Sequence, residues 1–108
     1  MAESTGFDWD PANVAHIARH GVVPVHVEQA LSNDPVNLSY VVAGSGEQRW
    51  ASVGPTDDGR LLVVVWTMRG DRVRVVTAYP ATKRMRAAYA SAKGGSHGAQ
   101  ETDPEVQQ

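Results

Sequence analysis

Residues 61–79 read LLVVVWTMRGDRVRVVTAY, and this stretch predicts the principal hairpin of the fold. Two runs rich in β-branched residues flank Gly70-Asp71, and a two-residue loop that begins with glycine suits a type II′ turn between antiparallel strands. The unbroken apolar run 61–66 indicates a strand that is covered on both faces. In the second run, Arg72 and Arg74 alternate with valines, so they share one face that reaches solvent or a ligand. We expect this hairpin at the centre of the sheet.

The chain before this hairpin contains two further turn signals between β-branched and aromatic segments. Gly44-Ser45-Gly46 and Asp57-Asp58-Gly59 both combine glycine with small polar residues, as chain reversals require. Together with Gly70-Asp71, they divide residues 36–79 into four strands. The short connections predict an antiparallel sheet, because parallel strands need longer crossovers.

Helix signals occur at both ends of this strand region. Asp10 followed by proline is a standard N-cap and first-turn pair, so a first helix is predicted from residue 11 to a stop at Gly21. A second helix is predicted over residues 24–31, and a third, capped by threonine, over residues 82–92. The predicted fold class is α+β, with two N-terminal helices packed on a four-stranded antiparallel sheet and a C-terminal helix after it.

The apolar residues of this 108-residue chain are concentrated in one segment, which predicts a single domain over residues 7–92. Residues 1–6 and 93–108 have almost no apolar content and are predicted to be disordered tails. The chain has no cysteine, no long apolar run and no signal-peptide pattern at its start. We therefore expect a cytoplasmic protein that does not enter a membrane.

Charge is distributed unevenly along the chain. Residues 1–46 carry one basic and five acidic side chains, whereas residues 47–86 carry eight basic and four acidic ones. The second segment could face a polyanion such as RNA. From charge alone, the more ordinary interpretation is a solvated face whose charges pair with the acidic half of the chain.

His16 and His20 stand four residues apart, a spacing at which two imidazoles on a helix can share a metal ion. The remaining ligands of a zinc site are missing from the sequence, so we predict no metal site. His20 near a helix C-terminus is also explained by its interaction with the helix dipole.

The tripeptide Arg69-Gly70-Asp71 resembles an adhesion motif, but a hairpin turn accounts for it fully. Trp9 and Trp66 alternate with apolar neighbours and are predicted to lie in the core, whereas Trp50 leaves core and base stacking open.

Five motifs then occur in one fixed order along most of the chain. They are FDWDP at 7–11, RHGV at 19–22, RWASVG at 49–54, GRLLVVVWTMRGDRVRVVTA at 59–78 and AAY at 87–89. In this combination the sequence resembles the BrnT family, small bacterial ribonuclease toxins of type II toxin-antitoxin systems with a RelE-like fold. The resemblance covers residues 7–89.

The resemblance implies an endoribonuclease that cleaves RNA without a metal ion or cofactor, by attack of a ribose 2′-hydroxyl on the adjacent phosphate. It also implies a cognate ribbon-helix-helix antitoxin as partner. The implied assembly is either a homodimer of the toxin or a toxin–antitoxin heterotetramer. The implied catalytic residues are His20 as proton carrier, with Arg49 and Arg19 as cations on the phosphate. This mechanism requires that His20 and Arg49 converge on one open groove.

The implied RNA-binding residues are Arg72, Arg74, Tyr79 and Lys83. Tyr79 departs from the family pattern, because an arginine is usual there, and Met85 replaces a usual glutamate. Asn13 and His16 stand where the pattern has lysine and asparagine. A cation and a proton acceptor are thus missing from their usual positions. The alternative function is a catalytically impaired homologue that binds an antitoxin or nucleic acid, and a third is a domain unrelated to toxins.

Overall fold

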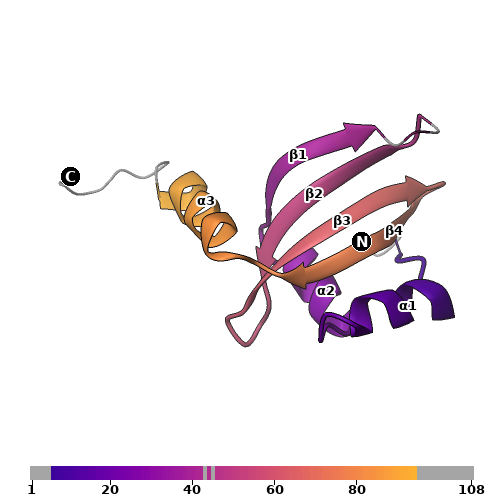
Figure 1. Ribbon diagram of the computed structural model, residues 1–108, viewed down its shortest axis with the longest axis horizontal. Coiled ribbons are helices and arrows are strands. Elements are labelled where there is room, and N and C mark those ends of the chain that lie inside the picture. Colours follow the sequence, from indigo (N-terminus) through magenta and orange to yellow (C-terminus); the bar gives the residue numbers. More distant parts are fainter. Residues whose placement is uncertain (1–5, 43, 45, 95–108) are drawn as a thin grey trace.

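The computed structural model describes residues 6–42, 44 and 46–94. Two helices precede a four-stranded antiparallel sheet and one helix follows it, which confirms the predicted fold class (Figure 1). In chain order the elements are α1 (Pro11–Ala18), α2 (Pro24–Ser32), β1 (Val36–Val42), β2 (Gln48–Pro55), β3 (Leu61–Arg69), β4 (Arg72–Pro80) and α3 (Lys83–Gly94). Within this described part of the chain, no helix has the length and apolar character needed to cross a membrane.

The sheet is a meander whose strands lie side by side in the order β1-β2-β3-β4. Arg69 pairs with Arg72, and Gly70 has a φ of 63°, which confirms the two-residue loop that begins with glycine. The prediction that this hairpin forms the centre of the sheet was wrong for β4, which is an edge strand. Strand β4 is nevertheless as apolar as a central strand. It can be so because other parts of the chain cover its free edge and shield it from solvent.

The free edge of β4 is closed by the segment that leads into α1. The amide of Asp8 donates to the carbonyl of Val73 at 2.8 Å, and the amide of Val73 donates to the carbonyl of Gly6 at 3.0 Å. Further along, α1 lies beside the strand (Figure 1), and the side chain of Asn13 donates to the carbonyl of Val75 at 3.2 Å. These contacts satisfy backbone groups that an open edge leaves to solvent or to another chain.

A β-bulge in β4 changes which side chains share a face of the sheet. Val65 pairs with Thr77 and Trp66 pairs with Val75, so Val76 is an extra residue in the ladder. In a regular strand Arg74 and Tyr79 would point to opposite faces, because they are an odd number of residues apart. The bulge brings both to the face opposite the core, and Val75 and Ala78 both to the core.

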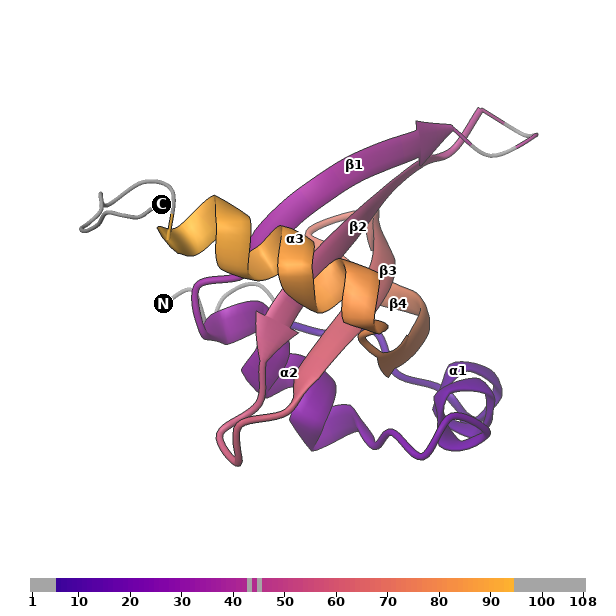
Figure 2. The same cartoon turned by 60° about the vertical axis from the view of Figure 1, so that its left-hand side comes forward.

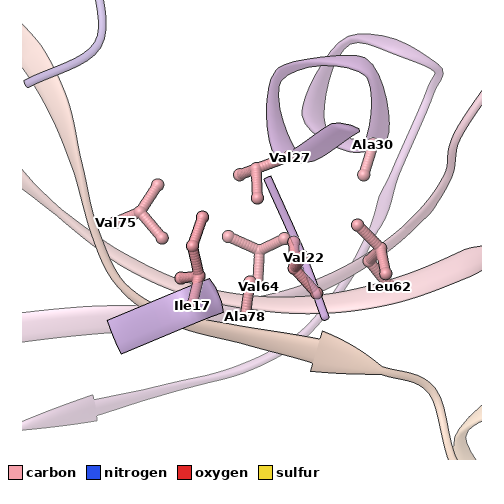
Figure 3. Close-up of a cluster of buried hydrophobic side chains, with 8 residues drawn as sticks. All are labelled: Ile17, Val22, Val27, Ala30, Leu62, Val64, Val75 and Ala78. Carbon is pink, nitrogen blue, oxygen red and sulfur yellow. The ribbon is translucent and has the colours of Figure 1, made fainter. Parts of the chain in front are cut away.

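The hydrophobic core lies between one face of the sheet and the two N-terminal helices (Figure 3). Its fully buried members come from α1, α2, the turn between them, β3 and β4, and they are Ile17, Val22, Val27, Ala30, Leu62, Val64, Val75 and Ala78. Trp9 and Trp66 pack against this cluster, which confirms their predicted place. Trp50 stacks on Trp66 with ring centroids 4.8 Å apart, on the same side of the sheet as the helices.

The second face of the sheet is covered at one end. Val53 and Val63 alternate with residues that face α2, so they point the other way, and both are fully buried. This confirms that β3 is covered on both faces. The C-terminal helix α3 passes in front of the sheet at this end in Figure 2, with Met85 and Tyr89 half-buried and Ala88 exposed.

The start of α3 matches the prediction, because the hydroxyl of Thr82 accepts a hydrogen bond from the amide of Met85 at 3.2 Å. The helix continues to Gly94, two residues beyond the predicted end of the domain. Lys93 forms an ion pair with Asp34, just before β1, at 2.5 Å. The predicted tails otherwise lie outside the described residues, apart from Gly6.

Helix α2 lies directly against β2 at Gly54. A Cβ atom at this position would come within 1.9 Å of the carbonyl oxygen of Ala30. Only a glycine therefore allows the helix to pack this closely on the sheet.

We predict that Gly54→Ala lowers the free energy of unfolding by about 1–3 kcal/mol or more, because backbone must move to admit the methyl group. Urea denaturation followed by circular dichroism measures this loss. Gly6→Ala is the control, because a Cβ at Gly6 meets no atom within 4 Å. Equal stability of the two variants would contradict the close packing.

Candidate functional site

Three arginines from three neighbouring strands lie on the face of the sheet away from the core. Arg49 comes from β2, Arg69 from β3 and Arg74 from β4, and all three line a cleft of about 230 Å³ beside α1. Thr67 lies among them and is buried, and its hydroxyl donates to the carbonyl of Gln48 at 2.6 Å. We call this site the cationic cleft, and its polar lining consists of Asn13, His16, Glu47, Arg49, Thr67, Arg69 and Arg74.

Arg74 is held by two carboxylates at the start of α1. Its guanidinium lies 2.9 Å from an oxygen of Asp10 and 3.4 Å from an oxygen of Asp8. The hydrogen bond that Arg74 donates to the carboxylate of Asp10 is the main reason why the pKa of Arg74 is raised above its ordinary value. This predicted RNA-binding residue therefore lies in the cleft, but its charge is partly offset by its neighbours.

Asn13 joins α1 to β4. Its side-chain oxygen accepts from the amide of Asp10 at 2.8 Å, while Asp10 accepts from the amide of Asn13 at 2.9 Å, which completes a capping box. The amide group of Asn13 also donates to the carbonyls of Asp8 and Val75, and the residue is only 4% exposed. Because each polar atom has a partner, burial of this side chain stabilises the position of the helix. This accounts for the asparagine that departs from the usual lysine.

The two histidines of α1 differ in their relation to the cleft. His16 is half-buried and lines it, whereas His20 is exposed and is not among the lining residues. The His20 ring lies 5.8 Å from that of His16 and 6.1 Å from that of Tyr79, measured between centroids. The three rings form an aromatic edge beside the cleft. The structure therefore brings Arg49 and His16 together in the cleft lining. His20 lies outside this lining, with its ring in contact with the ring of His16.

Arg49 is paired with a carboxylate from the chain just before β2. Its Nε atom lies 3.1 Å from Oε2 of Glu47, and both side chains are about one-third exposed, at 36% and 29%. Within the described residues, the terminal nitrogens of Arg49 make no hydrogen bond to protein. Arg69 has no ion pair there either. These groups are the donors in the cleft that can contact an anion without first leaving a partner.

The other sequence-predicted site residues lie outside the cleft lining. Arg19 is the exposed C-cap of α1, and Lys83 is the exposed first residue of α3. Arg72 is exposed beside the β3–β4 turn, where its guanidinium lies 3.5 Å from the carbonyl of Phe7. The structure thus brings Arg49 and Arg74 together, with Tyr79 at the aromatic edge, and leaves these three cations more distant.

Three charged or titratable residues of the cleft, His16, Glu47 and Arg69, were not among the predicted site residues. The sequence suggests His16 as a metal ligand, Arg69 as part of a turn and Glu47 as one acidic residue in a basic segment, and it assigns none of them to an RNA site. Strand alternation places Arg69 and Thr67 on one face and could have identified Arg69. No pattern in the sequence relates Glu47 to His16, because they come from distant parts of the chain. Among the described residues, no group of three or more His, Asp or Glu side chains is arranged to hold a metal ion.

Comparison with known families adds an independent result. A family model described as "Ribonuclease toxin, BrnT, of type II toxin-antitoxin system" matches residues 9–84. This span contains α1, α2, all four strands and the start of α3, and with them all residues of the cationic cleft. A search of curated proteins found no relative that matches the chain.

We predict that the anchoring of Arg74 makes folding stability depend on the ionisation of Asp10. The pKa of Asp10 is lowered from 3.8, first by the hydrogen bond from the amide of Asn13 and then by Arg74. The stabilisation is complete above pH 3.8 and is lost as the pH falls through the lowered, folded-state pKa. Asp10→Asn keeps a capping side chain but removes the charge.

The melting temperature of Asp10→Asn should therefore be lower than that of the wild type at about pH 6, and the difference should shrink below about pH 4. Asp71→Asn, in the exposed turn, is the matched control and should show no such gap. A constant difference across this pH range would contradict the proposed charge effect.

Proposed function

The chain belongs to the BrnT family of ribonuclease toxins of type II toxin-antitoxin systems, and from this premise we propose that it cleaves RNA without a metal ion. The reaction is attack of a ribose 2′-hydroxyl on the adjacent phosphate, with departure of the 5′-oxygen. It needs fixed cations on the phosphate, a group that accepts the 2′-hydroxyl proton and a group that protonates the leaving oxygen.

The observation that supports this proposal best is the meeting of three guanidiniums and an imidazole in one cleft. Arg49 and Arg69 have donors that are not engaged by protein, so they are the proposed phosphate ligands. Guanidinium donors are suited to this task, because they bind phosphate oxygens in pairs and keep their charge at any relevant pH. Arg74 shares the cleft, but its ion pairs with Asp8 and Asp10 favour a role in holding α1 against β4.

Proton donation is assigned to the histidine pair of α1. Imidazole titrates near neutral pH and can therefore give a proton to the leaving oxygen. His16 lines the cleft, whereas His20, the histidine that the motif RHGV suggested, lies beside it at the aromatic edge. We assign the direct transfer to His16 and a supporting role to His20.

The more distant predicted residues are proposed as contacts along the bound RNA. Tyr79 lies beside His20 and can stack on an unpaired base. Arg19, Arg72 and Lys83 are exposed cations outside the cleft lining, and their charge attracts the phosphate backbone of RNA. Their effect is predicted to depend on salt more strongly than that of Arg49.

Membership of the family implies an antitoxin partner. We propose a ribbon-helix-helix antitoxin encoded beside the gene, in a heterotetramer of two toxins and two antitoxins, with a toxin homodimer as the alternative assembly. Cleavage and neutralisation are both proposed to take place in the cytoplasm.

The test is cleavage of single-stranded and structured RNA by the purified protein in EDTA. We expect His16→Ala to reduce kcat/KM by about 10²–10⁴-fold through loss of the proton donor. Arg49→Ala should reduce kcat by about 10²–10³-fold through loss of charge stabilisation. His20→Ala should cause a smaller loss than His16→Ala.

His26→Ala is the matched control, because His26 belongs to α2 and contacts Arg60, away from the cleft. It should leave the rate unchanged. A larger loss from His20→Ala than from His16→Ala would assign the proton transfer to His20. Wild-type activity in the double variant His16→Ala with His20→Ala, or no RNA cleavage at all by the wild type, would overturn the proposal.

A second candidate function is a catalytically impaired homologue that binds an antitoxin or nucleic acid. Two observations favour it: Tyr79 and Met85 replace a usual arginine and glutamate, and carboxylates already engage Arg49 and Arg74. Tyr79 lies beside the His20 ring, so an arginine there would add a cation at the edge of the cleft.

If this second function holds, the wild type expressed without antitoxin should not slow bacterial growth. The combined change Tyr79→Arg with Met85→Glu should then create toxicity, because it restores a cation and a proton acceptor. The two single variants serve as controls for either group alone. Full toxicity of the wild-type chain in the same growth assay would contradict impairment.

A further inference from the structure

A carboxylate lies in the cationic cleft, and neither the family motifs nor the proposed roles assign it a function. Glu47 precedes β2, lines the cleft together with His16 and contacts Arg49 through Oε2 at 3.1 Å. It is the only acidic side chain in the lining of this cleft among the described residues. The remaining charged or titratable groups that line the cleft are His16 of α1, Arg49 of β2, Arg69 of β3 and Arg74 of β4.

The contact with Arg49 leaves part of each group available. It uses one oxygen of Glu47, and Oε1 makes no hydrogen bond within the described residues. It uses Nε of Arg49, whose terminal nitrogens point to no protein acceptor there. A phosphate bound by those terminal nitrogens would therefore share the guanidinium of Arg49 with a carboxylate that keeps one oxygen available.

We propose that Glu47 is the catalytic residue that accepts the proton of the attacking 2′-hydroxyl. This inference rests on the proposed ribonuclease function and completes it, because His16 supplies the proton donor and no residue has yet been assigned as the proton acceptor. Among the other candidates, arginines cannot accept a proton at neutral pH. Asp8 and Asp10 do not line the cleft, and both are paired with Arg74.

The step balances in protons and bonds. The carboxylate of Glu47 takes the 2′-hydroxyl proton as the 2′-oxygen bonds to phosphorus. The bond from phosphorus to the 5′-oxygen breaks, and the imidazolium of His16 gives its proton to that oxygen. The products are a 2′,3′-cyclic phosphate, a 5′-hydroxyl end, a protonated Glu47 and a neutral His16. The guanidiniums of Arg49 and Arg69 stabilise the additional charge on the phosphate during the transfer.

The test compares Glu47→Gln with the wild type in the pH dependence of kcat/KM for a short single-stranded RNA. Glutamine keeps an oxygen that accepts from Nε of Arg49, so the arginine stays in place while the proton acceptor is lost. We expect kcat/KM to fall by about 10²–10⁴-fold. We also expect the acidic limb of the profile to disappear, because that limb arises from protonation of the carboxylate. Glu47→Asp should restore part of the rate and the limb.

Asp57→Asn is the control. Asp57 follows the C-terminal end of β2, whereas Glu47 precedes its N-terminal end, and both substitutions remove one negative charge. It should leave the profile unchanged, and thermal unfolding should show that all variants are folded. A slower Glu47→Gln enzyme that keeps the acidic limb would reduce Glu47 to a residue that positions Arg49 and would overturn the proposal. Wild-type rates in Glu47→Gln would overturn it while leaving the ribonuclease function intact. Failure of the wild type to cleave RNA would overturn both.

Discussion

The attachment of α1 to the edge of β4 is the constraint on which the site depends. Asn13 is buried and uses its side chain to cap the helix and to bind the backbone of β4, while Asp10 caps the same helix and pairs with Arg74. A helix end and an edge strand both have unsatisfied backbone groups, and here each supplies partners for the other. Because α1 carries His16, these contacts also set the position of an imidazole relative to the sheet. A structural hydrogen-bond network thus determines the geometry of the proposed chemistry.

The β-bulge at Val76 makes the second contribution to the site. It brings Arg74 and Tyr79 to the same face of β4, although a regular strand would separate them. As a result, the edge strand presents a cation near the start of α1 and an aromatic ring near its end. Bulges often occur beside active sites because they redirect side chains without changing the fold. Here the bulge also lets Val75 and Ala78 both enter the core.

The cationic cleft is less positive than a count of its arginines suggests. Carboxylates pair with Arg49 and Arg74, and Arg69 has no such partner among the described residues. An RNA phosphate gains less electrostatic stabilisation from a guanidinium that already has an anionic neighbour. The affinity for RNA should therefore depend on Arg69 and on the exposed cations outside the cleft, which are Arg19, Arg72 and Lys83. The same carboxylates have an advantage, because they hold their arginines in place before RNA arrives. Organisation of this kind lowers the cost of arranging charges during the reaction.

The sequence by itself determined the helix starts at Pro11 and Pro24, the turn at Gly70 and the core positions of Trp9 and Trp66, because these follow from local backbone preferences and from periodicity. It also suggested Arg49 and Arg74 as residues of an RNA site, but it could not show that they line one cleft. Only the tertiary structure decided that β4 lies at an edge, that His16 rather than His20 lines the cleft, and that Glu47 lies there too. The physical reason is that these outcomes depend on contacts between distant segments of the chain and on the β-bulge at Val76 in β4. A local pattern carries no information about either.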